Sequence, residues 1–217
     1  GGGMVPVATA PAVKGDLGVY LSALGTVTSL NAITVKSRAD GELQKIHFKE
    51  GQLVAAGDLL AEIDPRSYQA ALDQAEGQLA RDTAVLENAR LDLKRYEGAR
   101  ESVTQQQIDS AAATVAQFSG SVRADQAIVA MDKLLLSYCR ITAPIAGRVG
   151  LRLVDEGNLI SANGASSGIV VLTQEQPISV VFNIPEDNLP AIRKAFAAGE
   201  ELAVEAYDRS ATTRLAA

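Results

Sequence analysis

Two long stretches in the middle of the chain carry apolar residues at alternating steps of three and four. The first runs through Leu72, Ala75, Leu79, Asp82, Leu86, Ala89, Leu93 and Tyr96. The second runs through Ile108, Ala111, Val115, Phe118, Val122, Asp125, Val129, Asp132 and Leu136. This spacing is typical of a coiled-coil seam, so it predicts two long helices packed on each other. The three aspartates mark either a weakened, solvated part of the seam or a place where the hairpin flares or meets a neighbour.

The break between the two stretches falls near Gly98 to Thr104, which predicts a turn that sends the second helix back antiparallel to the first. Each predicted helix has about 32 residues, so at a rise of 1.5 Å per residue the hairpin would project roughly 50 Å. Asp64 and Pro65 predict the start, with a capping carboxylate and a proline in the first turn.

The segments on either side of the hairpin repeat each other at an offset of 106 residues, which relates Gly41 to Gly147. Ten residues after each of these glycines comes a second one, Gly51 or Gly157, within a Glu-Gly-x-Leu-apolar block. Chance similarity of two turn-rich stretches is the alternative. The number of matched positions favours a true repeat, and such repeats indicate half-modules that need each other to bury their apolar faces.

Each copy is predicted to form short strands between glycine turns, because apolar and polar residues alternate there. The inward-facing residues are expected to be Leu43, Ile46, Phe48, Val149, Leu151 and Leu153. Glycine suits the turns, since other residues resist a positive φ. The turn glycines are expected to be Gly41, Gly51, Gly57, Gly147 and Gly157.

A second small β-domain is predicted from the rest of the chain. Residues 169–172 and 178–182 are strongly β-forming, 185–199 form a short amphipathic helix, and 202–207 form another strand. With an N-terminal strand around 19–27, these elements predict an incomplete β-barrel.

Composition narrows the possible functions. The net charge of −6 and the pI near 4.9 argue against a nucleic-acid groove or an anionic-lipid surface. Cys139 is the single cysteine and is expected to be a buried structural thiol. His47 is the single histidine, without ligand spacing around it, and is expected on a strand surface. The sequence therefore predicts no enzyme, no metal site and no cofactor.

Two motifs resemble known families. Residues 41–64 resemble half of a biotinyl/lipoyl domain, through Gly41, the pair Glu50-Gly51, and the run Gly57-Asp58 to Asp64. Residues 140–149, which read Arg-Ile-Thr-Ala-Pro-Ile-Ala-Gly-Arg-Val, resemble the return half found in HlyD-like membrane fusion proteins, the periplasmic adaptors of RND-type multidrug efflux pumps. The resemblance extends from about residue 5 to 209.

This resemblance implies an α+β fold: an antiparallel α-helical coiled-coil hairpin inserted into a split lipoyl-like β-sandwich, plus a partial β-barrel domain. The expected segments are N-terminal strands at 1–33, the first lipoyl-like half at 34–64, the hairpin at 65–138 with its tip at about 98–104, the second half at 139–173, and the partial barrel at 174–217. Residues 5–17 are expected to begin a membrane-proximal domain, and the chain is expected to be a fragment that lacks most of it.

The family resemblance also implies partners and a location. It implies an adaptor in the periplasm, associated with the inner membrane, that bridges an inner-membrane RND transporter to an outer-membrane channel and self-associates as a trimer or hexamer. The family's channel-binding tip pattern falls on Arg95, Thr104, Ile108 and Asp109. Thr replaces Ser, Ile replaces Leu, Ala99 stands where a Leu is expected, and the stretch is about two residues short. Alternatively, Arg95 and Thr104 only cap and solvate the turn.

Two other functions remain open beside the RND adaptor. The first is an adaptor of an ABC or major-facilitator exporter or of a type I secretion system, although such relatives tend to have longer hairpins or a membrane anchor. The second is a plain coiled-coil scaffold. A lipoyl or biotinyl carrier fails on its chemistry, because it needs a modifiable lysine at the turn where this chain has Asp64-Pro65-Arg66 and the hairpin.

Overall fold

The computed structural model describes residues 10–15, 18, 20–99, 101–162, 164 and 168–216. The chain divides into two compact units, one of residues 29–178 and one of residues 1–28 with 179–217. The first unit contains a β-sandwich and the long helices, and the second contains short strands and one short helix.

The β-sandwich consists of two four-stranded antiparallel sheets, and each sheet mixes strands from both copies of the repeat. One sheet has the order β2 (Ala32–Lys36), β9 (Gly168–Thr173), β7 (Gly147–Arg152) and β4 (Leu53–Val54). The other has the order β6 (Arg140–Thr142), β5 (Leu59–Ile63), β3 (Gly41–Ile46) and β8 (Leu159–Ile160). Neither half-module forms a four-stranded sheet without the other.

The two copies exchange equivalent backbone hydrogen bonds. The amide of Gly51 donates to the carbonyl of Val149, and the amide of Gly157 donates to the carbonyl of Leu43, both at 2.8 Å. These two bonds are related by the same 106-residue offset as the sequence repeat. The repeat is therefore a pseudo-twofold symmetry of the folded sandwich.

Two glutamates repeat this exchange with their side chains. Glu50 Oε1 accepts a hydrogen bond from the amide of Arg152 at 2.9 Å, and Glu156 Oε1 accepts one from the amide of Ile46 at 2.7 Å. Each carboxylate thus satisfies a strand-end amide of the opposite copy, and a hydrogen bond to a charged group is stronger than one between neutral groups. Because the spacing is the same in both copies of the repeat, each glutamate lies opposite its donor.

The sandwich core confirms some of the residues that were predicted to face inward. Leu43, Phe48 and Val149 are buried, whereas Leu151 and Leu153 are 74% and 54% exposed, so the prediction for these two was wrong. The β7–β9 pairing shifts register between Val149 and Arg152, and this irregularity breaks the alternation that the prediction assumed.

Cys139 is buried among these core residues, as predicted. Burial and the nearby charge of Asp64 both raise the pKa of its thiol.

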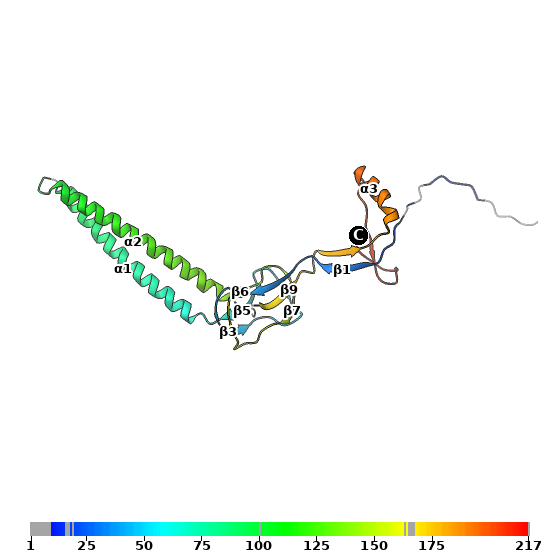
Figure 1. The fold of residues 1–217 in the computed structure, drawn as a ribbon, viewed down its shortest axis with the longest axis horizontal. Coiled ribbons are helices and arrows are strands. Elements are labelled where there is room, and N and C mark those ends of the chain that lie inside the picture. The colour runs from blue at the N-terminus through cyan, green and yellow to red at the C-terminus, as the bar shows by residue number, and fades with distance from the viewer. Residues whose placement is uncertain are drawn as a thin grey trace, which may run out of the picture. The chain divides into compact units, whose positions relative to one another are not determined.

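The two long helices are α1 (Arg66–Gly98) and α2 (Gln105–Tyr138), which lie side by side and are joined by a short turn (Figure 1). Both helix ends at the turn fall where the sequence predicted them. The seam residues are buried or half-buried, except Tyr96, which is exposed. Pro65 precedes the first helical residue instead of lying inside the first turn, and the amide of Arg66 donates to Asp64 Oδ1 at 3.0 Å.

The base of the hairpin is fixed to the sandwich by aromatic side chains of both helices. The Tyr68 hydroxyl donates to the carbonyl of Asp40 at 2.9 Å and accepts from its amide at 3.1 Å. The guanidinium of Arg38 lies 5.4 Å from the centre of the Tyr138 ring, a cation–π distance. These contacts set the direction in which the hairpin leaves the sandwich.

The second unit contains β1 (Gly25–Ser29) paired with β10 (Ile178–Phe182), the 3-10 turn η1 (Glu186–Asn188), α3 (Leu189–Ala197), and β11 (Ala206–Tyr207) paired with β12 (Arg214–Ala216). The helix predicted within 185–199 is confirmed. The predicted strands at 19–27 and 202–207 are shorter, since they begin at Gly25 and Ala206. Residues 5–9, 16, 17 and 19 lie outside the described residues, and residues 10–15 form no strand.

The five turn glycines fall into two kinds. Gly51, Gly57 and Gly157 have φ of 78°, 92° and 86°, and Gly41 has φ of 145°. Gly147 is not among the positive-φ residues. It is instead a close-approach position, because a Cβ there would lie 2.5 Å from the carbonyl oxygen of Thr173.

We predict that Gly147→Ala destabilises the sandwich by about 1–3 kcal/mol, since the added methyl must push the backbone of β9 away. Gly77→Ala is the matched control, because a Cβ at this helical position meets nothing within 4 Å. The control should gain about 0.5–1 kcal/mol from better helix propensity. Urea unfolding followed by circular dichroism measures both changes, and an equal effect of the two substitutions would contradict the close-approach explanation.

Candidate functional site

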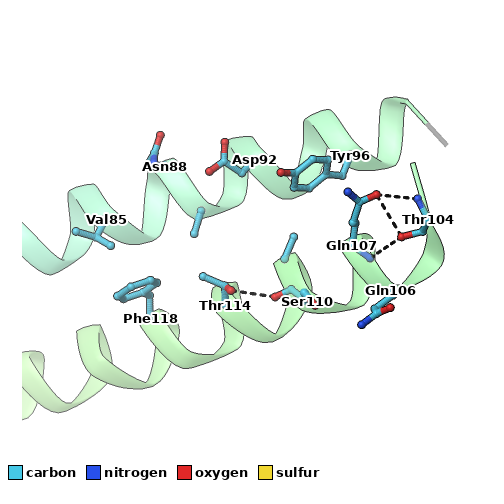
Figure 2. Close-up of a pocket in the computed structure, with 12 residues that line it drawn as sticks. Val85, Asn88, Asp92, Tyr96, Thr104, Gln106, Gln107, Ser110, Thr114 and Phe118 are labelled. Carbon is cyan, nitrogen blue, oxygen red and sulfur yellow. Dashed lines mark hydrogen bonds between the residues drawn. The ribbon is translucent and has the colours of Figure 1, made fainter. Parts of the chain in front are cut away.

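A groove opens between α1 and α2 in the half of the hairpin next to the turn (Figure 2). Its volume is about 560 Å³. The helices contribute both apolar and polar side chains to its lining. The lining residues are Val85, Asn88, Ala89, Asp92, Tyr96, Thr104, Gln106, Gln107, Ser110, Ala111, Thr114 and Phe118.

Thr104 is the N-cap residue of α2 and lines the groove next to the turn. Its Oγ1 accepts a hydrogen bond from the amide of Gln107 at 3.4 Å, and the Oε1 of Gln107 accepts one from the amide of Thr104 at 2.9 Å. Figure 2 shows this reciprocal pair, which is a capping box. The residues of the turn itself add a further bond, from the amide of Ser102 to the carbonyl of Ala99 at 2.8 Å.

Arg95 lies on the other side of the turn, in the last turn of α1. Its guanidinium pairs with the carboxylate of Asp92, and its side chain remains 73% exposed. A cation in the last turn of a helix also interacts favourably with the helix dipole. Arg95 therefore presents a positive charge to solvent beside the groove that Asp92 lines.

Ile108 and Asp109, the other two predicted tip residues, have different environments. Ile108 is buried in the hairpin, so in this conformation it fixes the start of α2 and offers no surface to a partner. Asp109 is exposed and accepts a hydrogen bond from Gln105 Nε2 at 2.9 Å. Of the four predicted residues, Thr104 alone is among the groove's lining residues.

Sequence reasoning missed Tyr96 and Gln107 as members of the site. Tyr96 was assigned to the seam, although the exposed side chain lines the groove. Gln107 could have been found, because Thr-x-x-Gln at a helix start is the signature of a capping box.

The groove can take part in hydrogen bonding through amide, hydroxyl and carboxylate groups, and apolar side chains such as Val85 and Phe118 lie beside them in its lining. Such a surface suits the side of another polypeptide. Within the described residues no cluster of three or more His, Cys, Asp or Glu has metal-binding geometry. His47 lies on the sandwich, where its Nε2 is 3.2 Å from Glu62 Oε2. None of the helices in the described part of the chain is long and apolar enough to span a membrane.

The sandwich and the inserted hairpin together match the family described as "RND MFP, barrel-sandwich hybrid domain" over residues 31–173. The chain belongs to the RND membrane fusion protein family. The family-matched region contains both copies of the repeat and the whole hairpin. The groove at the turn is thus part of a membrane fusion protein's barrel-sandwich region.

Similar membrane fusion proteins include the multidrug resistance protein MdtA of Cronobacter turicensis, which is 52% identical over 99% of this chain and 52% of its own length. MdtA of Pantoea ananatis is 53% identical over 95% of this chain and 51% of its own length. The chain spans about half the length of the curated relatives it matches. Among solved structures, a MacA-MexA chimeric protein containing the Pseudomonas aeruginosa MexA alpha-hairpin domain has a TM-score of 0.57 and 29% identity, covering 76% of this chain and 56% of that one.

We predict that Thr104→Ala weakens the start of α2 by about 1 kcal/mol, because the capping box loses its side-chain acceptor. Thr104→Ser keeps the hydroxyl and should behave like the unchanged protein. Amide hydrogen exchange of the first turn of α2 reports the difference. Equal protection in the alanine and serine variants would show that the capping box does not hold this helix start.

Proposed function

We propose that this chain is the hairpin-bearing part of a periplasmic adaptor, which bridges an inner-membrane RND transporter to an outer-membrane channel in a tripartite multidrug efflux pump. Identity near 50% to MdtA proteins supports this proposal. The observation that carries it is the geometry of the insertion. The helices α1 and α2 leave and re-enter the sandwich through β5 and β6, which are paired neighbours with Glu62 opposite Arg140.

Because the hairpin is attached to the sandwich at its base, its far end is the part best placed to contact a distant partner. With 33 and 34 residues, α1 and α2 would form a rod about 50 Å long. The 3/4 spacing of the seam supports a coiled coil, which resists bending better than a single helix. We assign the channel contact to the far end, with Arg95 and Thr104 at the surface and Ile108 and Asp109 holding the start of α2.

The remaining parts of the proposal follow the same division of labour. The sandwich, together with a partial β-barrel formed by the N-terminal strands and residues 174–217, docks on the transporter and on further copies of the adaptor, as a trimer or hexamer. The lipoyl-like halves are residues 34–64 and 139–173, and the hairpin is residues 65–138. The adaptor works in the periplasm beside the inner membrane and transmits contact without catalysing a reaction.

Cross-linking in cell envelopes tests the orientation of the rod. Glu101→Cys places a thiol on the exposed turn without removing the Thr104 cap, and the native Cys139 is buried. A thiol-reactive photo-cross-linker at this position is expected to form an adduct with the outer-membrane channel, identified by mass spectrometry. Ala70→Cys, an exposed position near the hairpin base, is the matched control and should give no channel adduct. Adducts with the channel at both positions, or only with a transporter, would refute the proposed contact.

A further inference from the structure

The middle of the hairpin seam contains a pair of carboxyl groups that the proposed function does not use. Asp125 of α2 is only 9% exposed, and its Oδ2 has no hydrogen-bond partner. Asp82 of α1 faces it across the seam. Asp82 also accepts a hydrogen bond from Arg81 Nε at 3.0 Å. Asp125 is the one acidic side chain among the buried residues that the structure describes.

Two ionised carboxylates are unfavourable in this position. Neither can donate a hydrogen bond, and a buried charge without a partner has lost the water that would solvate it. The charged groups of α1 that act on Asp125 are Asp82 and Arg81. Burial raises the pKa of Asp125 most, and the charge of Asp82 and a hydrogen bond with it raise this pKa further, while Arg81 lowers it.

We propose that Asp82 and Asp125 hold one proton between them, so that the middle of the hairpin is a proton-binding site whose occupancy controls how tightly α1 and α2 pack. With the proton bound, the carboxyl of Asp125 donates to the carboxylate of Asp82, and Arg81 stabilises the charge left on Asp82. Loss of the proton places two negative charges in the seam and loosens it. This inference concerns the hairpin itself and does not depend on the proposed efflux function.

The direction of the pH effect follows from the shifted pKa. The folded hairpin keeps a proton that an Asp in the unfolded chain, with its ordinary pKa of 3.8, has already released. The contribution to stability is therefore complete below that ordinary value, and it is lost as the pH rises through the raised pKa of Asp125. The packing of α1 against α2 is therefore more stable at low pH and less stable at high pH.

Hydrogen exchange of the whole chain tests the site. At pH 8.5, compared with pH 4.5 and after correction for intrinsic exchange, the wild-type seam segments 78–90 and 118–132 should lose severalfold in protection, because Asp125 releases its proton as the pH rises through its raised pKa. Asp125→Asn keeps the shape and can donate to Asp82 at any pH, so its protection should stay constant. Glu87→Gln, an exposed carboxylate on α1, is the control and should keep the wild-type pH dependence.

A carboxyl-carbon NMR titration gives a second, direct measurement, in which one of the two aspartates should keep its proton to a pH above the ordinary range. Two results would overturn the proposal. One is that both carboxyls ionise in the ordinary range and that Asp125→Asn leaves the pH dependence unchanged. The other is that magnesium or calcium chloride at pH 8.5 restores protection in the wild type and not in Asp125→Asn, since a metal cation and not a proton would then occupy the pair.

Discussion

In the unit formed by residues 29–178, the sandwich and the hairpin both depend on the reciprocal hydrogen bonding between the two copies of the repeat. Gly51 and Gly157 donate to equivalent carbonyls of the opposite copy, and Glu50 and Glu156 accept from equivalent amides. Because β5 and β6 pair inside this arrangement, the sandwich holds together the start of α1 and the end of α2. A long insertion between the copies then adds little closure entropy, since that cost grows only slowly with length. The sandwich holds the hairpin, and the hairpin does not weaken the sandwich.

Packing changes along the hairpin from base to turn. Near the base, Leu72, Ala75 and Val129 form a buried cluster, and Tyr68 fixes α1 to the sandwich. Near the turn, small side chains such as Ala89 leave the groove open between the helices. Tight packing makes the base rigid, whereas an open groove leaves polar side chains available to another molecule. The end of the hairpin farthest from the sandwich is thus the end that has polar side chains available for contact with a partner.

The sequence predicted the helices and the repeat well because both signals extend over many residues. The seam spacing continues for about thirty residues in each helix, so a single exception such as Tyr96 does not obscure it. Features that depend on one local irregularity could not be predicted. A register shift in β7 exposes Leu151, and the close approach of the Thr173 carbonyl requires glycine at position 147. Neither feature produces a recognisable pattern in the amino-acid sequence. At the turn, a family pattern placed Ile108 on the surface, although the seam spacing already assigned it to the interior.

The acidic pair also bears on how the far end of the hairpin is built. A seam made mostly of small and aliphatic side chains is similar to itself after each turn, so it specifies the alignment of the two helices weakly. A shift of α2 by one turn would place Asp125 against Leu79 or Leu86 and leave its carboxyl group without the one neighbour that can accept its proton. Buried polar residues are known to fix coiled-coil register at some cost in stability. An alignment fixed at Asp82 and Asp125 would also fix the relative positions of Arg95 and Thr104, because these residues lie on the same two rigid helices at the turn.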